Sequence, residues 1–379
     1  MKLMFITGSR GEWGYISPIL RLIQKSTDME YRLVVTNMHL LSTYGNSYKE
    51  IEKEGFTIHY KVNMSLDGYT HYTHAKSLGL FLLAMPDIIE TEKPDWIILA
   101  GDRGEQLMAA VAASYTYTPV AHIQAGELSG NIDGMARHAI GKLIHLHFAA
   151  NEDARQRLIK LGEQVFRCHN VGAPQLDDMV RGDYGDLSEI ERELSLDLSR
   201  GFILAVLHPV TEEYFKSRQQ AEVFIKALNY FDLPKILIAP NNDAGTNDIL
   251  YAINNFKRGE YHVYHNLKRK HYLMFLKNCK CIVGNSSSGL LEAPTFRTPA
   301  VNIGNRQNSR FRGNNVIDTD FDTELIIKSV EKAMSAEFKN FLINNVDYPY
   351  GDGHSSEKIL ELLRTTMVDD KLISKHLTY

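Results

Sequence analysis

The feature that most constrains the fold is a repeated alternation of short apolar runs with longer amphipathic segments. In the first half, LMFIT, YRLVVT, WIILA and PVAHI are followed by SPILRLIQKS, YKEIEKEG, EQLMAAVAASYT and GMARHAIGKLIHL. Runs that are apolar throughout are typical of parallel strands buried on both faces, and the segments between them have helical periodicity. The alternation therefore predicts an α/β architecture.

The same alternation begins again after residues 181–201, a charged stretch that predicts a linker. FILAVLH, KILIAP, YHVYH, CIVG and PAVNI are each followed by a helical pattern, and 379 residues are enough for two cores. We therefore predict two doubly wound, Rossmann-like domains, 1–180 and 181–354. A last helical segment, in 355–379, is free to pack on either domain.

The net charge and the length of the apolar runs argue against some classes of protein and some kinds of partner. Lys and Arg number 42 against 46 Asp and Glu, so the net charge of -4 gives no general attraction to nucleic acid or anionic lipid. The first apolar run has five residues, too few for a signal peptide, and no stretch of 18 apolar residues occurs. We expect a soluble, cytoplasmic protein without nucleic-acid or membrane partners.

Cysteine and histidine spacing gives no metal motif. Cys168, Cys279 and Cys281 form neither an even disulfide set nor a zinc-site spacing, so we expect buried structural thiols. The spacings from His138 to His145 and from His145 to His147 are seven and two residues, unlike the i, i+4 pair of a zinc-binding helix. We predict no metal site.

Polar clusters follow the expected strands again and again. GSRGEWG, GDRGE and QAGE lie in the first half, and HPVTEE, GNSSSG and GNRQNSR lie in the second. In open parallel sheets, ligands bind beyond the carboxyl ends of strands. With three clusters from each half, the simplest predicted site is a cleft between the two domains.

The densest cluster, residues 122–140, holds Glu127, Asp133, Arg137 and His138. One acid would be explained by helix capping, but two carboxylates with cations nearby are how a proton donor and a proton acceptor obtain different pKa values. This cluster therefore predicts general acid–base chemistry. In GDRGE, Asp102 adds a carboxylate; the alternative is a helix N-cap beside a solvated pair of charges, Arg103 and Glu105.

Two glycine-bounded clusters suit phosphate groups. GSRGEWG lies between an expected strand and a helix whose first turn is expected at Ser17–Pro18. Its backbone N–H groups and Arg10 are donors that suit a phosphate, and the alternative is a tight structural turn. In GNSSSG, serine hydroxyls suit a diphosphate and Glu292 suits ribose hydroxyls, whereas a serine N-cap with the glutamate at N3 needs no ligand. The serines are Ser286, Ser287 and Ser288.

Two weaker signals lie in the second half. His208 stands after the first strand there and would face the cleft, although a lone histidine before proline is often structural. The loop 304–318 carries Arg306, Arg310 and Arg312 without a nearby acid, which indicates either an anionic partner or a solvated loop.

Taken in order, these motifs resemble those of the hydrolysing UDP-N-acetylglucosamine 2-epimerases. The resemblance runs from residue 1 to about residue 365 and is strongest to the branch that feeds sialic-acid and legionaminic-acid synthesis. It implies a GT-B fold, in which two Rossmann-like domains face a cleft and the C-terminal helix crosses back to the first domain. It also implies a homodimer or homotetramer that converts UDP-N-acetylglucosamine and water into UDP and N-acetylmannosamine through a glycal, without a cofactor.

The resemblance assigns roles to the candidate residues. It implies that Asp102 and Asp133 are catalytic carboxylates and that His208 lies by the diphosphate. The residues implied to bind UDP are Arg10, Ser286, Ser287, Ser288 and Glu292. We expect four further residues to bind the UDP-sugar, namely Gln124, Arg137, His138 and Arg306, and we count His208 and Glu127 among the catalytic candidates. Many family members have HIEGGE where this chain has HIQAGE. Because Gln124 cannot act as a base, either Glu127 carries that role or Gln124 only orients the N-acetyl group.

Two alternatives from other classes remain: a GT-B glycosyltransferase that passes the sugar to an acceptor, and a sugar-nucleotide binding protein without turnover. Within the family, the substrate can also be a UDP-2,4-diacetamido-2,4,6-trideoxyhexose. Residues that would read its C4 and C6 are expected in loops such as 63–75.

Overall fold

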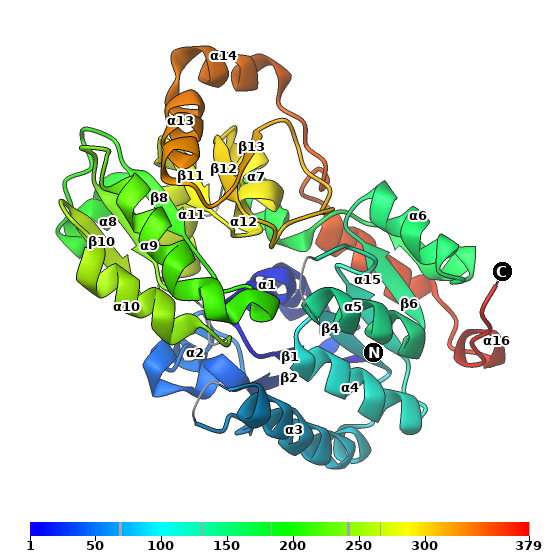
Figure 1. Cartoon of the computed structure of the whole chain (residues 1–379). Helices are drawn as coiled ribbons and strands as arrows, with labels where there is room; N and C mark the ends of the chain where they lie inside the picture. The colour runs from blue at the N-terminus through cyan, green and yellow to red at the C-terminus, as the bar shows by residue number, and fades with distance from the viewer. Residues whose placement is uncertain (68–69, 130–131, 183, 241–242, 266, 379) are drawn as a thin grey trace. The chain divides into compact units, whose positions relative to one another are not determined.

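The computed structural model describes residues 1–67, 70–129, 132–182, 184–240, 243–265 and 267–378 (Figure 1). The chain divides into two compact units. Unit 1 comprises Met1–Leu128, Ile132–Arg181 and Tyr350–Tyr379, and unit 2 comprises Ser129–Asn131 and Gly182–Pro349. The chain thus leaves unit 1 near residue 181 and returns to it at Tyr350.

Within its described residues, unit 1 contains a parallel sheet of seven strands in the order β3-β2-β1-β4-β5-β6-β7. The strands are β1 (Lys2–Thr7), β2 (Glu30–Thr36), β3 (Tyr60–Val62), β4 (Trp96–Ala100), β5 (Val120–Ile123), β6 (Leu146–Ala149) and β7 (Cys168–Asn170). The strand order reverses between β1 and β4, which is where ligands bind in doubly wound sheets.

Helices cover both faces of this sheet (Figure 1). Side chains alternate along β1, so Leu3 and Phe5 pack with α1 and α15, while Met4 and Ile6 pack with α3, α4 and α5. The helices of unit 1 are α1 (Arg10–Gln24), α2 (Tyr48–Lys53), α3 (His71–Glu92), α4 (Gly104–Tyr115), α5 (Ile132–Leu143), α6 (Glu152–Lys160), α7 (Asp177–Arg181), α15 (Ser355–Thr365) and α16 (Asp370–Ile373). The predicted doubly wound architecture is confirmed.

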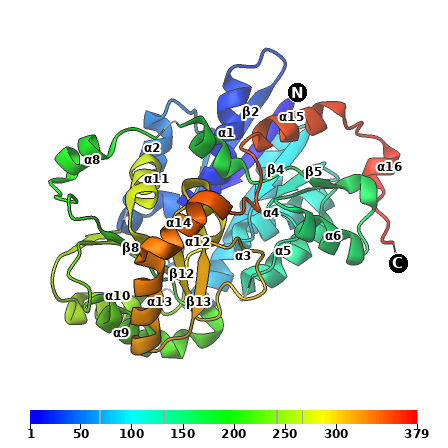
Figure 2. The same ribbon diagram turned by 90° about the horizontal axis from the view of Figure 1, so that it is seen from above.

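The returning C-terminal segment packs on unit 1, where α15 lies against α1 (Figure 2). The buried carboxylate of Asp177 accepts hydrogen bonds from the first backbone N–H groups of α15, from Ser355 at 3.0 Å and Ser356 at 2.7 Å. These N–H groups have no partner inside the helix, so Asp177 caps it.

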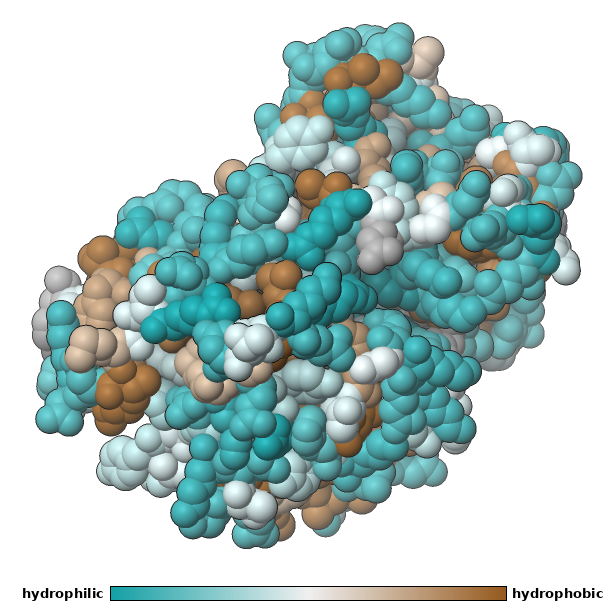
Figure 3. Space-filling model, turned by 180° about the vertical axis from the view of Figure 1, so that it is seen from behind, coloured by the Kyte–Doolittle hydropathy of each residue, from teal (hydrophilic) through white to brown (hydrophobic). Residues whose placement is uncertain are grey.

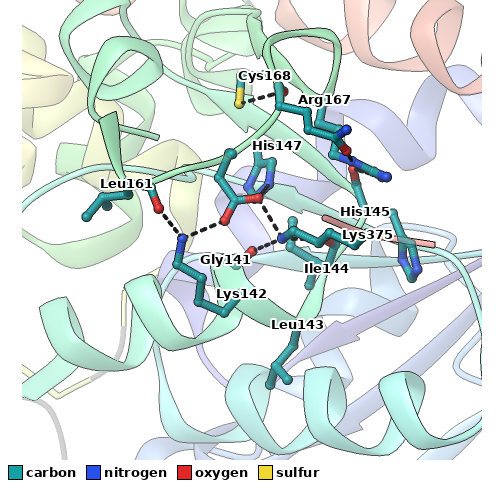
Figure 4. A network of polar contacts seen from close by, with 12 residues as sticks. Gly141, Lys142, Leu143, Ile144, His145, His147, Leu161, Arg167, Cys168 and Lys375 are labelled. Atoms are coloured by element: carbon teal, nitrogen blue, oxygen red, sulfur yellow. Dashed lines mark hydrogen bonds and ion pairs between the residues drawn. The ribbon is translucent and has the colours of Figure 1, made fainter. Parts of the chain in front are cut away.

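A polar network holds the end of the chain (Figure 4). The ammonium of Lys375 lies 2.6 Å from the carboxylate of Glu163, which His147 also contacts at 3.0 Å. The buried guanidinium of Arg167 donates to the carbonyls of Leu372 and Lys371, at 2.7 and 2.8 Å. Residues 371–375 are therefore fixed to unit 1 by charged groups with little exposure to solvent.

Unit 2 contains, in its described part, a parallel sheet of six strands in the order β10-β9-β8-β11-β12-β13. They are β8 (Ile203–Val206), β9 (Lys235–Ile238), β10 (Tyr261–Tyr264), β11 (Cys281–Gly284), β12 (Ala300–Ile303) and β13 (Val316–Thr319). The helices are α8 (Leu187–Leu194), α9 (Ser217–Leu228), α10 (Thr246–Phe256), α11 (Arg269–Asn278), α12 (Ser288–Leu291), α13 (Thr323–Met334) and α14 (Ala336–Asn345). Ile203 and Ala205 of β8 pack with α9, α10 and α13, whereas Phe202 meets Phe275 of α11.

Several sequence predictions are wrong in detail. The expected linker 181–201 contains α8, which packs on α11 and has a buried residue, Ile190, so residues 184–201 belong to unit 2 rather than to a linker. The helix expected over 134–146 ends at Leu143, and Leu146 already belongs to β6. Strands β3, β6 and β13 were not predicted.

The hydrophobic residues on the drawn surface and the cysteine side chains are distributed as expected for a folded domain. On the face drawn in Figure 3, hydrophobic residues stand in small groups among hydrophilic ones. All three cysteines are buried and free, which confirms the prediction of structural thiols. Across the part of the chain that the structure describes, no helix is both long enough and apolar enough to cross a membrane.

Candidate active site

Asp102 lies at the carboxyl end of β4, beyond Gly101, whose φ of +85° ends the strand. Its carboxylate forms an ion pair with the guanidinium of Arg137 on α5. Arg137 is 3% exposed, and its Nε and Nη1 atoms have no hydrogen-bond partner among the described residues. The capping alternative for Asp102 is wrong, because the N-cap of α4 is Arg103. A buried guanidinium whose N–H groups are not all hydrogen-bonded favours an anionic or strongly polar ligand.

Asp133 and His138 lie on the same helix as Arg137. Asp133 is half-buried in the first turn of α5, one helical turn before Arg137, so the two side chains share a face. Burial lowers the pKa of His138, which favours its neutral form. The predicted cluster 122–140 includes Gly130 and Asn131, which lie outside the described residues. The helix therefore presents a carboxylate and a guanidinium together.

Glu127 is 1% exposed and hydrogen-bonded through both oxygens. The side-chain amide of Asn151 donates to Oε1, and the hydroxyl of Tyr350 donates to Oε2 at 3.3 Å. Asn151 is also the N-cap of α6, where its Oδ1 accepts from the N–H of Ala154 at 2.8 Å. Neither Asn151 nor Tyr350 was predicted from the sequence.

Gln124 follows β5 in the left-handed backbone region, with φ of +64°. Its buried amide donates from Nε2 to Oε1 of Gln175 at 3.4 Å. Gln124 Oε1 and Gln175 Nε2 have no hydrogen-bond partner in the described part of the chain. The two amides thus retain one acceptor and one donor side by side. Gln175 was not predicted, because nothing in its local sequence marks it.

The loop GSRGEWG starts α1 earlier than expected. Ser9 and Glu12 form a capping box, in which the Glu12 carboxylate accepts from the backbone N–H of Ser9 at 3.0 Å, so α1 begins at Arg10 and Ser17–Pro18 lies inside it. Burial and the neighbouring carboxylate of Glu105 raise the pKa of Glu12 to about 8. The prediction of a first turn at Ser17–Pro18 is wrong.

Arg10 and Arg103 are both held by carboxylates. Arg10 makes a two-pronged ion pair with Glu50, at 2.9 and 3.2 Å, and burial lowers its pKa. An anion that binds Arg10 would have to share it with Glu50. Arg103 lies 3.3 Å from Glu105, which is fully buried, so the expected solvated pair is wrong.

In unit 2, Asn285 joins the GNSSSG loop to the HPVTEE loop. Its Oδ1 accepts from the backbone N–H of His208 at 2.8 Å, and its Nδ2 donates to the carbonyl of His208, also at 2.8 Å. Gly284 has φ of +137°, and a Cβ there would lie 1.9 Å from the carbonyl oxygen of Val206. The two loops therefore require glycine and asparagine at these positions, and His208 is half-buried beside the serines.

The serine loop is connected to two further charged residues. The Ser288 hydroxyl donates to one oxygen of Glu292, and Arg269 on α11 forms an ion pair with the other. The capping alternative is wrong, since the N-cap, Ser287, makes no side-chain capping bond and Glu292 lies at the end of α12. Ser286 Oγ accepts from the N–H of Ser288 at 3.3 Å. Arg269 was not predicted, because its partner is 23 residues away in sequence.

The arginine loop is only partly as expected. Arg306 donates to the carbonyl of Asn285 at 3.2 Å, which brings it to the serine loop. Arg312 forms an ion pair with Asp318, so the expectation of three arginines without a nearby acid is wrong. Arg306 is thus the arginine of this loop that the structure connects to the predicted phosphate-binding residues.

The structure groups the predicted residues by unit. Asp102, Gln124, Glu127, Asp133, Arg137 and His138 lie at or after β4 and β5, which are hydrogen-bonded neighbours. His208, Ser286, Ser287, Ser288, Glu292 and Arg306 lie after β8, β11 and β12, which are adjacent in the second sheet. No group of three His, Cys, Asp or Glu residues within the described residues is arranged to hold a metal ion.

The comparisons with known proteins agree with the motifs. The family model described as UDP-N-acetylglucosamine 2-epimerase matches residues 21–364. A Legionella pneumophila protein named UDP-N,N'-diacetylbacillosamine 2-epimerase (hydrolyzing) is 34% identical over 377 residues, which are 99% of this chain and 98% of the relative. A Neisseria meningitidis UDP-N-acetylglucosamine 2-epimerase is also 34% identical, over 88% of each chain.

Solved structures show the same fold. The N. meningitidis UDP-GlcNAc 2-epimerase bound to UDP-GlcNAc matches with a TM-score of 0.81 at 17% identity, covering 97% of this chain and 100% of the other. The Methanocaldococcus jannaschii enzyme, in complex with UDP-GlcNAc and UDP, matches with a TM-score of 0.80 at 21% identity, with the same coverage. The predicted GT-B fold is confirmed.

Proposed function

Because the chain belongs to the UDP-N-acetylglucosamine 2-epimerase family, we propose that it is a hydrolysing epimerase. It converts UDP-N-acetylglucosamine and water into UDP and N-acetylmannosamine, for the synthesis of sialic-acid-type sugars. The observation that carries the proposal is the group of carboxylates at the ends of β4 and β5, in which Asp102 pairs with the buried Arg137 and Glu127 is held by two neutral donors. Glycosyl transfer alone would not need so many proton-transfer groups.

The reaction requires these groups because the C2 hydrogen of an N-acetylhexosamine is not next to a carbonyl. Cleavage of the C1–O bond releases UDP and gives C1 oxocarbenium character, which acidifies the C2 hydrogen. A base then removes that proton to form the glycal. Water adds at C1 while an acid delivers a proton to the opposite face of C2, so the reaction needs two titratable groups.

The carboxylates of unit 1 supply this proton transfer in our proposal. Asp102 and Asp133 or Glu127 act as the base and the acid, with Arg137 and His138 beside them. Gln124 orients the N-acetyl group, because the acceptor and donor that Gln124 and Gln175 retain complement the N–H and C=O of a secondary amide. This leaves the proton chemistry to Glu127 rather than to position 124.

The serine and arginine loops of unit 2 bind UDP in this proposal. Ser286, Ser287 and Ser288 donate to the diphosphate, with His208 and Arg306 as further donors. Glu292, oriented by Arg269 and Ser288, accepts from the ribose hydroxyls. Fixed donors of this kind stabilise the charge that develops on the departing UDP.

A second substrate is favoured by the relative from L. pneumophila, whose name specifies UDP-N,N'-diacetylbacillosamine. We propose the diacetamido sugar as the alternative substrate of the same reaction. The loop 63–75, where we expect C4 and C6 to be read, contains Gly68 and Tyr69, which lie outside the described residues. We further propose that the enzyme is a cytoplasmic homodimer or homotetramer.

Incubation of the purified protein with UDP-N-acetylglucosamine in D₂O, without an acceptor, tests the function. The expected products are UDP and N-acetylmannosamine carrying deuterium at C2, observed by NMR. Intact substrate would contradict the proposal: a glycosyltransferase turns over only when an acceptor is added, and a binding protein retains the nucleotide unchanged. A parallel incubation with the UDP-diacetamido sugar ranks the two substrates by kcat/KM.

A further inference from the structure

Tyr350 stands where the chain returns to unit 1, and its side chain reaches the candidate site. We propose that Tyr350 is a positioning residue for Glu127, so that the C-terminal segment is a working part of the catalytic half of the enzyme. This inference rests on the proposed function, because it assigns a task to a tyrosine through the carboxylate that transfers a proton.

The contact is well defined. The Tyr350 hydroxyl donates to Glu127 Oε2 at 3.3 Å while the Asn151 amide donates to Oε1, so both carboxylate oxygens are oriented. Tyr350 and Glu127 are each 1% exposed. Water therefore has little access to replace the hydroxyl, and the plane of the carboxylate is set by protein groups.

The backbone around Tyr350 fits closely against unit 1. The carbonyl of Tyr350 accepts from the N–H of Ala173 at 2.8 Å. A Cβ on Gly172 would lie 3.1 Å from that carbonyl oxygen and 2.6 Å from Ser355 Oγ, and a Cβ on Gly351 would lie 3.0 Å from the Cα of Gly172. Two glycines with positive φ thus let the returning chain approach, which fixes the tyrosine ring.

The hydrogen bond has a defined electrostatic consequence. A hydroxyl that donates to a carboxylate favours its charged form and lowers its pKa. Removing the Tyr350 hydroxyl should therefore move one limb of the pH–rate profile to higher pH.

Tyr350→Phe is the test, because it keeps the ring and removes only the hydroxyl. We expect kcat to fall about tenfold, as for a lost hydrogen bond to a charged group. We also expect KM to change less than about twofold and one limb of the pH–kcat profile to move up by roughly half a unit or more. A purely structural role would lower the melting temperature without moving the profile.

Tyr60→Phe is the matched control. The Tyr60 hydroxyl donates to the Glu92 carboxylate at 2.7 Å in the same unit, at the edge strand β3 and away from the candidate residues. This variant removes the same kind of bond and should leave the pH profile unchanged. If Tyr350→Phe has the profile of Tyr60→Phe, the inference is overturned.

A second measurement covers the case in which Tyr350→Phe folds poorly. Replacing Tyr350 by 3-fluorotyrosine keeps the ring and hydroxyl but makes the hydroxyl a stronger donor, so the same limb should move to lower pH; no movement overturns the inference. If wild type and Tyr60→Phe both turn over the substrate, but the variant at position 350 leaves the pH–rate profile unmoved, this inference alone is rejected. Absence of turnover by wild type rejects the proposed function and the inference with it.

Discussion

The carboxylate of Asp102 and the guanidinium of Arg137 form an ion pair that joins the end of β4 to α5. Arg137 is almost fully buried, so its charge depends on Asp102 for compensation. The pair also fixes the side of α5 that carries Asp133. One interaction therefore aligns two of the proposed catalytic carboxylates.

Asp102→Asn should lower kcat by about 10²–10⁴-fold, the range for loss of a general acid or base. It should also lower the free energy of unfolding by about 3 kcal/mol, because a buried guanidinium is left without its counter-charge. Steady-state kinetics and urea unfolding measure the two effects. Asp153→Asn is the control, since it breaks an Asp–Arg pair of the solvent-facing side of α6, and it should leave kcat unchanged.

Glu127 and Gln124 have different expected phenotypes. Glu127→Gln should lower kcat by about 10²-fold or more, because an amide cannot transfer the proton. Gln124→Ala should mainly raise KM for the N-acetyl sugar, because it removes an amide that orients the substrate without changing the titratable groups. Initial rates at several substrate concentrations separate the two; an unchanged kcat in Glu127→Gln would assign the proton transfer to Asp102 and Asp133.

Arg269→Met should weaken UDP binding about tenfold, because Glu292 loses the cation that orients it. Isothermal titration with UDP measures this change. Arg218→Met is the matched control in unit 2, where Arg218 pairs with Asp248 at 3.2 Å on the surface. If both variants bind UDP as wild type does, Glu292 is not part of the nucleotide site.

Strand β4 was predicted because each of its residues is apolar and buried, and a short, continuous apolar run is typical of a strand covered on both faces. Strands β3 and β13 are short edge strands with half-buried residues, so their pattern carries little signal. Ser9 and Glu12 start α1 seven residues before Ser17 because a capping box outweighs the preference of Pro18 for a first turn.

The candidate site was predicted where its residues lie in one short motif and missed where they come from distant chain segments. Asp102 and Glu127 stand next to strand ends, so their place followed from the topology. Tyr350 reaches Glu127 from 223 residues further along the chain, and no local pattern marks that contact. Gln175 and Arg269 were missed for the same reason: their partners are defined only by the folded chain.

Unit 1 should lose stability as the pH falls below neutrality, because burial lowers the pKa of several histidines. It lowers the pKa of His39 and His122 to about 3 and of His145 and His147 to about 4. Since the unfolded histidines titrate near 6.5, the unfolded state binds more protons between pH 6.5 and 4, and stability falls with pH in that window. Each histidine contributes up to about 1.4 kcal/mol per pH unit.

Glu163 extends the loss of folding stability to lower pH. Although its burial opposes the shift, the hydrogen bond from His147 and the charge of Lys375 lower its pKa to about 2, so its contribution is present above about pH 4.5 and lost as the pH falls toward 2. Urea unfolding followed by circular dichroism from pH 7.5 to 4 should show the histidine slope. His39→Gln should reduce that slope. An unfolding free energy independent of pH across this range would show that the buried histidines are protonated in the folded protein.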